Sequence, residues 1–580
     1  MEHPNPQFER DCFESLNGTW EFEIGKGERR TDCPLSGHIE VPFCPQSALS
    51  GVGVTDFIDG CVYSRIINVT EEDLTRRLVL HFGAVDYKAQ VYVNGQYITS
   101  HVGGYTAFEA DITTAVHAGE NRITVVVQDD MREDFPSGKQ SRKRQSFGCF
   151  YMRTTGIWQS VWLERTPTVF LNSVRYYPDI RECTVKVELE GEGSAPVHIA
   201  VFYEGRLVGE AQEEMAFRLT FTIPLREKHL WTLGEGNLYD VEITFGEDRV
   251  KSYFGLREVK YQGRQFRLND KSVFQRLVLE QGYYPDGIYT APSVEVMRRD
   301  IENALALGFN GARLHQKVFE QRYLYECDKA GFLVWGEFPS WGVEYGKLNF
   351  LGRFISEWAE VVEQYFNHPS IITWCPLNEV WTNLWDKRKI RNVRFVESVY
   401  AVTKLLDGSR PCIDASGGYH GRFTDVFDFH HYGSCQETDQ YMERLEREGR
   451  LDVDTLYPPD SAQENIVYDG EKPLNVSEYG GFSYIGDGDR TLDFSDRADR
   501  SDPITAEDGW GYSTCQDEEK LVREYVGLTR RYMDCDKISG FCYTQEKNGF
   551  YTYFRTPKLS KKAMSVIAEC NRSRAAIEEE

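Results

Sequence analysis

The sequence predicts a multidomain protein of β and α/β class: an N-terminal jelly-roll-like β-sandwich, an immunoglobulin-like β-sandwich and a C-terminal (β/α)8 barrel. Three observations support this prediction. The 580 residues suffice for about three to five domains. Residues 1–260 contain short alternating or apolar segments bounded by Gly, Asn and Asp, which are typical of strands. From residue 261, strand and helix patterns alternate, as they do in a closed α/β barrel.

Residues 1–165 are the first predicted domain. Strands are expected at Thr19–Ile24, Val62–Val69, Arg77–Phe82, Ala89–Val93, Arg122–Gln128 and Ile157–Leu163. The dipeptide Asn94-Gly95 lies between two β-rich segments and predicts a two-residue hairpin loop. No extended helical period interrupts the pattern, so the domain is expected to be a β-sandwich.

Residues 166–260 continue the strand pattern with a different spacing. Strands are expected at Ser173–Tyr177, Thr184–Glu190, Val197–Tyr203, Ala216–Ile223 and Leu238–Phe245. A domain of this length with about seven strands is typical of an immunoglobulin-like sandwich.

Residues 261–580 carry the barrel pattern. Its eight strands are expected at Val273–Leu279, Phe309–Leu314, Phe332–Trp335, Ile371–Cys375, Cys412–Ala415, Val426–His431, Leu474–Glu478 and Ile538–Tyr543. Helices are expected at Ser293–Leu307, Glu320–Ala330, Phe354–Phe366, Asn392–Leu406, Glu518–Cys535 and Ser560–Asn571. The fifth helix is poorly marked, and Gln436–Gly470 is expected to be a long excursion before strand seven. The arithmetic of eight strands with intervening helices predicts a TIM barrel.

Composition excludes several classes of function. The net charge is −25, so neither nucleic acid nor an anionic membrane is expected as a partner. A hydrophobic fraction of 41% argues against disorder. The chain starts without the basic and apolar regions of a secretory signal, and it has no apolar run long enough for a transmembrane helix. The 14 cysteines lie singly without a CxxC pair, which favours reduced thiols in the cytoplasm and offers no zinc site.

Two carboxylates are expected at the C-terminal ends of the barrel strands, where the active site of such a barrel lies. Glu379 follows the fourth strand and Glu478 ends the seventh. Glycoside hydrolysis requires such a pair, one as proton donor and one as anion. A single Glu after a strand is usually a solvated loop residue or a helix N-cap partner. The pair, with Asn378 directly before Glu379, favours the catalytic interpretation.

Other polar and aromatic side chains lie near the same strand ends. They comprise Arg313, His315, Trp341, His430, Tyr432, Tyr543 and Gln545. The two histidines are candidate ligands for sugar hydroxyls, although a strand-end His is often simply packed and satisfied. Trp341 and Tyr543 are candidate platforms for the C–H faces of a sugar, or else core aromatics.

Several motifs in order resemble glycoside hydrolase family 2, the group of β-galactosidases, β-glucuronidases and β-mannosidases. The resemblance covers nearly the whole chain. It is carried by Leu16-Asn17-Gly18-Thr19-Trp20, His81-Phe82-Gly83-Ala84-Val85-Asp86, Tyr92-Val93-Asn94-Gly95, His101-Val102-Gly103-Gly104-Tyr105 with Phe108, Thr155-Gly156-Ile157-Trp158-Gln159-Ser160-Val161, Tyr253-Phe254-Gly255-Leu256-Arg257, and His368-Pro369-Ser370 with Trp374 and Asn378-Glu379. It implies a sugar-binding-like first sandwich and a catalytic barrel.

The resemblance also implies roles for individual residues. Glu379 is the implied general acid/base and Glu478 the implied nucleophile. Asn378 would hydrogen-bond the sugar 2-hydroxyl, an interaction that strengthens in the transition state. Tyr432 resembles the tyrosine that orients the nucleophile, unless it is a core aromatic. Arg313 resembles the arginine that keeps the nucleophile anionic, a role that overlaps with that of a buried structural ion pair.

Three departures from the family pattern bear on the sugar. His315 lies two residues after Arg313 rather than three. Near the end of strand one, where many members carry His-Glu-Asp, this chain has Leu279-Glu280-Gln281-Gly282-Tyr283-Tyr284-Pro285-Asp286. Glu280 and Asp286 are therefore candidates for holding the non-reducing sugar. Glucuronidases of the family carry an Asn-x-Lys pair where this chain has Glu546-Lys547-Asn548. An acidic residue there would repel a glucuronate, although Lys547 would compensate if the loop shifts. This favours a neutral hexose, and Gln281–Gly287 resembles chains usually called β-galactosidases.

The expected function is thus an exo-acting retaining β-glycosidase, foremost a β-galactosidase, acting on an oligosaccharide or glycoside. A β-glucuronidase, β-mannosidase or furanosidase of the same family is the alternative. A catalytically inactive carbohydrate-binding protein is a third interpretation, although neither carboxylate is missing. No metal or organic cofactor is expected, since two carboxylates suffice. The family also makes a homo-oligomer a reasonable expectation.

Overall fold

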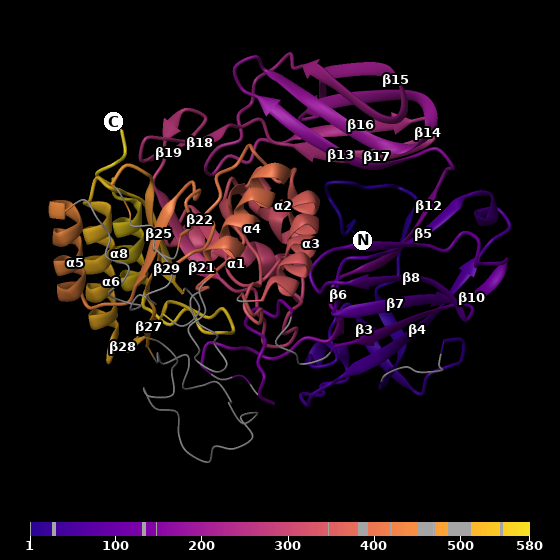
Figure 1. The fold of residues 1–580 in the computed structure, drawn as a ribbon, viewed down its shortest axis with the longest axis horizontal. Helices are drawn as coiled ribbons and strands as arrows, with labels where there is room; N and C mark the ends of the chain where they lie inside the picture. Colours follow the sequence, from indigo (N-terminus) through magenta and orange to yellow (C-terminus); the bar gives the residue numbers. More distant parts are fainter. Residues whose placement is uncertain are drawn as a thin grey trace.

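The computed structural model describes residues 2–25, 31–129, 135–144, 146, 148–345, 347–380, 392–417, 420–448, 468, 470–484, 512–545 and 549–579. Two β-sandwiches lie beside a larger α/β unit. In Figure 1 the first lies next to helix α3 (Leu348–Tyr365), and the second lies at the top of the view. This arrangement agrees with the predicted fold class.

The first sandwich has two main antiparallel sheets. One has the strand order β1-β12-β5-β9 and the other β3-β2-β4-β10-β7-β8, with a short β6–β11 pair beside them. The strands are β1 (Phe13–Ser15), β2 (Gly18–Ile24), β3 (Gly37–Val41), β4 (Gly60–Val69), β5 (Arg77–Phe82), β6 (Val85–Asp86), β7 (Lys88–Val93), β8 (Gln96–Val102), β9 (Phe108–Asp111), β10 (Gly119–Gln128), β11 (Gly156–Ile157) and β12 (Val161–Thr166). Their inward side chains, such as Trp20 and Leu80, form one buried apolar core.

The hairpin predicted at Asn94-Gly95 is confirmed. Val93 pairs with Gln96, so the loop contains two residues. The φ angles of Asn94 and Gly95 are 50° and 79°. Positive φ at both positions is the requirement of a type I′ turn, which Asn-Gly satisfies at little cost.

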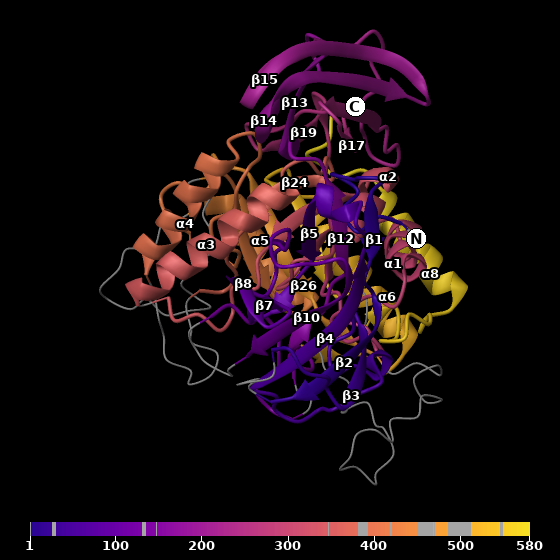
Figure 2. The same ribbon diagram turned by 90° about the vertical axis from the view of Figure 1, so that its right-hand side faces the viewer.

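The second sandwich is built on a long bent hairpin, which curves across the top of Figure 2. Its strands are β13 (Phe170–Asp179), β14 (Thr184–Tyr203), β15 (Arg206–Pro224), β16 (Tyr239–Phe245) and β17 (Asp248–Phe254). The segments predicted as separate strands at 184–190 and 197–203 are one continuous strand. The β14–β15 register shifts between Glu190 and Ser194, and β14 pairs with β13 before this bend and with β16 after it. Strand β17 was not predicted.

The α/β unit is a parallel sheet curled into a barrel. Within the described residues its strand order is β24-β23-β22-β21-β29-β26-β25. These strands are β21 (Gln275–Glu280), β22 (Gly311–Leu314), β23 (Leu333–Glu337), β24 (Ile371–Cys375), β25 (Phe427–His431), β26 (Leu474–Gly480) and β29 (Ile538–Thr544). The surrounding helices are α1 (Val294–Ala306), α2 (Gln321–Ala330), α3 (Leu348–Tyr365), α4 (Val393–Leu406), α5 (Cys435–Glu448), α6 (Glu518–Met533) and α8 (Lys561–Arg572).

Two small sheets flank this barrel. The antiparallel strands β18 (Val259–Gln262), β19 (Gln265–Leu268) and β20 (Lys271–Ser272) pack side chains such as Phe266 against the barrel interior, where Trp335 and Ile372 lie. Strand β18 therefore crosses residue 260, the predicted end of the second domain. Strands β27 (Phe482–Ser483) and β28 (Ser513–Thr514) pair in parallel.

The prediction for barrel position five is corrected. Residues 412–415 do not form a regular strand but make isolated parallel bridges beside β24. Trp374 N donates to Pro411 O at 3.0 Å, and Ile413 N donates to Trp374 O at 2.9 Å. Toward β25 there are contacts through side chains: Ser416 Oγ donates to Asp428 at 2.6 Å. Residues 412–417, the position-five segment, are thus extended and bonded to β24 through the backbone, whereas on the β25 side the one backbone hydrogen bond among the described residues is from Asp425 N to Cys412 O at 3.1 Å.

Helix α5 corrects a second prediction, because the segment 436–470 begins with a regular helix. Its sequence is mostly polar, and the buried positions are Thr438, Met442 and Leu445. This narrow stripe was too weak to indicate a helix. Among the described residues between the position-five segment and β25, none is helical.

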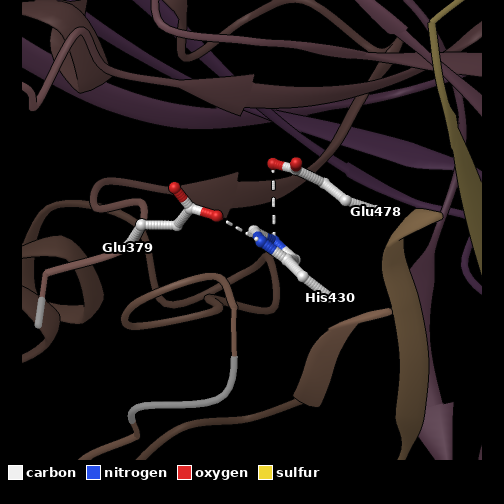
Figure 3. A group of neighbouring side chains, drawn as sticks. All are labelled: Glu379, His430 and Glu478. Carbon is white, nitrogen blue, oxygen red and sulfur yellow. Dashed lines mark hydrogen bonds and ion pairs between the residues drawn. The ribbon is translucent and has the colours of Figure 1, made fainter. Parts of the chain in front are cut away.

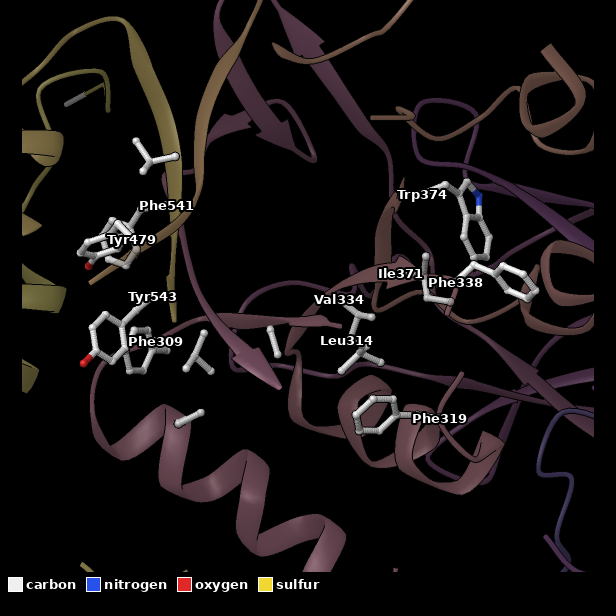
Figure 4. Packing of buried hydrophobic residues seen from close by; sticks show 14 of the residues in the cluster. Phe309, Leu314, Phe319, Val334, Phe338, Ile371, Trp374, Tyr479, Phe541 and Tyr543 are labelled. Atoms are coloured by element: carbon white, nitrogen blue, oxygen red, sulfur yellow. The ribbon is translucent and has the colours of Figure 1, made fainter. Parts of the chain in front are cut away.

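Apolar side chains fill the space between the barrel sheet and its helices (Figure 4). Phe309, Leu314, Val334 and Ile371 belong to this buried cluster. Every one of the 14 cysteines lies within the described residues, and each is a free thiol. No helix in the described ranges has the length and apolarity needed to cross a membrane.

Candidate active site

Glu379, His430 and Glu478 meet at the C-terminal ends of β24, β25 and β26, as Figure 3 shows. One carboxylate oxygen of each glutamate and one ring nitrogen of His430 all lie within 4.8 Å of one another. His430 Nδ1 is 2.8 Å from Glu379 Oε1, and its Nε2 is 3.4 Å from Glu478 Oε1. The strand-end prediction thus placed both carboxylates at one mouth, and the imidazole lies between them.

Glu478 is buried and surrounded by donors. Arg313 Nη1 donates to its Oε1 at 3.1 Å, and the Tyr432 hydroxyl donates to its Oε2. Burial opposes the negative charge, but His430 and Arg313 outweigh this effect and hold the pKa of Glu478 at about 2. The carboxyl group is therefore an anion at neutral pH.

His430 and Tyr432 respond to these same charges. Burial disfavours the imidazolium, but Glu478 and Glu379 raise the pKa of His430 above its usual value. Burial and the charge of Glu478 raise the pKa of Tyr432 well above its usual value, so its hydroxyl remains a donor. The Tyr432 ring stacks on Tyr512 with 3.5 Å between centroids.

Arg313, at the end of β22, is completely buried and bonds to three side chains. Its Nε donates to Glu337 at 2.6 Å, and its Nη2 donates to Asn378 Oδ1 at 2.6 Å. Glu337, at the end of β23, is a residue of the site that the sequence analysis missed. The strand-end rule that selected Glu379 would also have selected Glu337.

Asn378 has an unused donor. Its Oδ1 is occupied by Arg313, whereas its buried Nδ2 has no hydrogen-bond partner among the described residues. A buried amide without a partner is uncommon and calls for an explanation such as a ligand. Its position beside Glu379 suits the predicted contact with a sugar hydroxyl.

Glu379 has a left-handed backbone, with φ of 51°. Its N–H donates to Ser416 O at 3.0 Å, so the position-five segment fixes this conformation. A non-glycine residue in this region costs about 1–3 kcal/mol, which the surrounding structure must offset. Such strain is typical of functional positions, and here it directs Glu379 toward His430.

A second buried network of hydrogen bonds contacts His430, and the sequence did not indicate this network. Asp428 on β25 accepts hydrogen bonds from Ser416 and Ser477, and Ser416 Oγ lies 3.1 Å from His430 Nε2. His420 lies between two carboxylates, with Nδ1 2.7 Å from Asp414 and Nε2 3.0 Å from Asp428. Because His420 and Asp414 come from a segment without regular structure, no periodicity pointed to them.

The other predicted residues divide into those near the pair and those elsewhere. His315 is buried with Nδ1 3.0 Å from Glu337 Oε1, and Trp341 Nε1 donates to Asn378 O at 3.2 Å. Gln545 accepts a hydrogen bond from Gln281 at the same mouth. Glu280 Oε1 accepts from the backbone N–H groups of Gln281 and Gly282 at 3.0 and 2.9 Å.

One of the predictions is corrected. Tyr543 is fully buried against Tyr525 of α6 and Phe550, so its ring belongs to the core between sheet and helices and is no sugar platform (Figure 4). Asp286 is exposed, and its carbonyl accepts from Ser47 Oγ of the first sandwich at 2.5 Å. The backbone of Asp286 thus joins two domains, and the contact of its carboxylate with the sugar stays a prediction. The predicted sugar-contacting stretch Glu546–Asn548 lies outside the described residues.

Comparison with known proteins agrees with this geometry. Family models match residues 48–167 (Glycosyl hydrolases family 2, sugar binding domain), 169–257 (Glycosyl hydrolases family 2) and 262–492 (Glycosyl hydrolases family 2, TIM barrel domain). A putative beta-glucuronidase of Formosa agariphila is 28% identical over 345 residues, which are 56% of this chain and 40% of that protein. A beta-galactosidase of Thermoanaerobacterium thermosulfurigenes is 27% identical over 341 residues, 54% of this chain and 46% of that protein.

The matched part of the chain thus spans less than half the length of these two relatives. Among solved structures, a beta-glucuronidase of an uncultured Clostridium species superposes with a TM-score of 0.78 at 21% identity, covering 99% of this chain and 100% of that one. This similarity establishes the fold. With all three domain types matched in order along the sequence, the chain belongs to glycosyl hydrolase family 2.

Proposed function

We propose that the protein is a retaining β-glycosidase that removes sugars from non-reducing ends. The separation of the two carboxylates carries this proposal. Oxygens of Glu379 and Glu478 lie within 4.8 Å of each other. Retaining enzymes need carboxyl groups about 5–5.5 Å apart, whereas inverting enzymes need about 6.5–9.5 Å to admit a water. The observed spacing supports direct attack by a carboxylate.

In the first step, the anion of Glu478 attacks the anomeric carbon while Glu379 gives its proton to the leaving glycosidic oxygen. The C–O bond to the aglycone breaks and a glycosyl ester of Glu478 forms. In the second step, Glu379 takes a proton from water, the water oxygen attacks the anomeric carbon, and Glu478 leaves as the free carboxylate. Arg313 and Tyr432 stabilise the free carboxylate of Glu478 before the first step and after the second.

Two sugars are candidates for the substrate. A neutral β-galactoside is favoured by the acidic residue in Glu546-Lys547-Asn548 and by the likeness to a beta-galactosidase. A β-glucuronide is favoured by the larger number of relatives that bear this activity in their names. A panel of nitrophenyl β-glycosides separates the two, because each substrate differs in one sugar only.

Variants with the carboxyl groups removed test the mechanism. Glu478→Ala and Glu379→Ala should each lose at least about a thousandfold in kcat, because each removes a group that acts on the reacting bonds. With added azide, Glu478→Ala should give an α-glycosyl azide and Glu379→Ala a β-glycosyl azide. NMR of the wild-type reaction should show the β-anomer of the free sugar first. Initial release of the α-anomer would contradict retention, and full activity in both variants would contradict the assignment.

A further inference from the structure

A segment of the first sandwich, residues 135–144, reaches the barrel mouth. Ser137 N and Gly138 N donate to Trp341 O at 2.8 and 3.1 Å. Gly138 has φ of 56°, and a Cβ there would lie 2.4 Å from the carbonyl oxygen of Gln316, which follows β22. Only glycine allows such an approach, so the segment is held closely against the barrel.

The two residues after Gly138, Lys139 and Gln140, are held by hydrogen bonds to residues 86, 151 and 154. Gln140 Nε2 donates to buried Asp86 at 2.7 Å, and Gln140 Oε1 accepts from Thr154 N at 2.9 Å. The carbonyl of Lys139 accepts from Tyr151 N at 2.8 Å. The backbone around Lys139 is therefore ordered by contacts on both sides, and its side chain is positioned by the first sandwich.

The side chain of Lys139 is buried beside Trp341. The residue is only 4% exposed, and its Nζ lies 5.3 Å from the centre of the Trp341 ring. In the part of the chain that the structure describes, neither a carboxylate nor a hydrogen-bond acceptor pairs with this ammonium. By contrast, Arg313 at the same mouth binds two carboxylates, and Lys317 donates to two carbonyls at 2.6 Å.

The charge of Lys139 affects the pKa values of two residues of the site, His315 and Glu337. Burial and, next, the charge of Lys139 lower the pKa of His315 well below its usual value. The same charge acts on Glu337, where it opposes the rise in pKa caused by burial. Glu337 is bonded to Arg313 and lies 3.0 Å from His315 Nδ1. The ammonium group of Lys139 therefore belongs to the region around the carboxylate pair.

We propose that Lys139 binds the carboxylate of an acidic sugar, so that the site is built for β-linked uronides. This inference rests on the proposed glycosidase function. A buried cation is costly without a counter-charge, and a sugar carboxylate provides one together with a charge-assisted hydrogen bond. A neutral hexose leaves the charge uncompensated. Because the cation comes from the first sandwich, the absence of the Asn-x-Lys pair from the barrel does not exclude a uronide.

Two matched substrate pairs test the proposal. Nitrophenyl β-D-glucuronide is compared with β-D-glucoside, and β-D-galacturonide with β-D-galactoside, since the members of each pair differ only at C6. In at least one pair, the wild-type kcat/KM should favour the uronide by tenfold or more. Lys139→Met should reduce this uronide-to-neutral ratio at least thirtyfold, mainly through a higher KM for the uronide. Lys139→Arg should restore part of the ratio.

Lys143→Met is the matched control, since Lys143 is exposed on the same segment and its loss removes the same charge. Its substrate ratio should equal that of the wild type. If Lys139→Met does not fold, the ionic-strength dependence of the wild-type enzyme replaces it: KM should rise with salt for the uronide and stay constant for the neutral sugar.

The outcomes separate this inference from the proposed function. Wild-type preference for the neutral sugar in both pairs, or an unchanged ratio in Lys139→Met, overturns the role of Lys139 and leaves the glycosidase intact. Absence of cleavage of any β-glycoside, with no azide adducts from the two glutamate variants, overturns the glycosidase itself.

Discussion

At the scale of single residues, the site separates its two carboxyl groups by their surroundings. Glu478 is bonded to Arg313 and Tyr432, whereas the bonds from Glu379 go to His430 and, through its backbone, to Ser416. Different environments allow one carboxyl group to remain an anion while the other exchanges protons. The proposed retaining mechanism needs this division.

Removing the Tyr432 hydroxyl tests how Glu478 is held. Tyr432→Phe keeps the ring that stacks on Tyr512 but deletes the bond to Glu478. The pKa of Glu478 should then rise from about 2 toward its usual value. Since the anion of Glu478 is the proposed nucleophile, the acid limb of the kcat/KM profile should move to higher pH, and kcat should fall about 10- to 100-fold. An unchanged acid limb would show that Tyr432 does not control this charge.

At the scale of elements, the ends of three barrel strands bring together a set of groups that also suits a cation. Glu379, His430 and Glu478 come from β24, β25 and β26 and offer one nitrogen and two oxygens. These donor types are ligands for Zn²⁺. Zinc should therefore inhibit in competition with substrate, because it would occupy both carboxylates, and chelator should reverse this.

His430→Gln is the control for zinc inhibition, because it removes one ligand and leaves both glutamates. Its inhibition constant should be at least tenfold weaker than that of the wild type, measured relative to its own uninhibited rate. Equal inhibition of the two proteins would show that zinc acts elsewhere on the chain.

The position-five segment predicts a pH effect on stability. His420 lies between Asp414 and Asp428, and although burial opposes its charge, these carboxylates raise its pKa to about 10 from 6.5. The imidazolium therefore stabilises the fold fully below pH 6.5, and this contribution decreases as pH rises toward 10. The slope for one proton is at most about 1.4 kcal/mol per pH unit. His420→Gln should remove this part of the slope.

The difference in unfolding free energy between wild type and His420→Gln isolates this group from others that titrate in the same range. Denaturant unfolding at pH 6.5, 8 and 9.5 provides the measurement. The difference should shrink with rising pH; a constant difference would mean that His420 does not gain a proton on folding.

The elements also show where sequence reasoning succeeds. Parallel strands end at one rim, so two glutamates after strands four and seven had to meet there. Tyr543 could not be assigned, because β29 is buried on both faces and its alternation does not tell lumen from helix layer. Asp414 and His420 lie in irregular structure, where periodicity carries no information.

At the scale of the whole molecule, the first sandwich packs directly against the barrel. Tyr87 bonds to Glu357 and Thr106 to Glu360, both on α3, and Gly138 lies against Gln316. Sequence motifs indicated these domains and their order. They could not indicate that Lys139 approaches Trp341, because this contact depends on how the two domains pack.

Gly138→Ala tests this packing. A methyl group at 138 would lie 2.4 Å from Gln316 O, so the segment should move away from Trp341 and KM should rise about tenfold. The two glutamates are untouched, so kcat should change less. Gly53→Ala is the control: Gly53 also has positive φ, at 63°, but its Cβ would meet nothing within 4 Å. Equal KM changes in the two variants would argue for backbone strain alone.

The sparse backbone bonding of the position-five segment on its β25 side has a further consequence for motion. Regular strands open only when several backbone bonds break together, whereas the seam between residues 412–417 and β25 is closed mainly by side chains such as Ser416 and Asp428. Such a seam has a low free energy of local opening. The barrel should open locally at this seam first. The amide hydrogens of residues 412–417 should therefore exchange with solvent sooner than those of β21 or β22. Since Ser416 O holds the backbone of Glu379, each opening also releases the proposed proton donor.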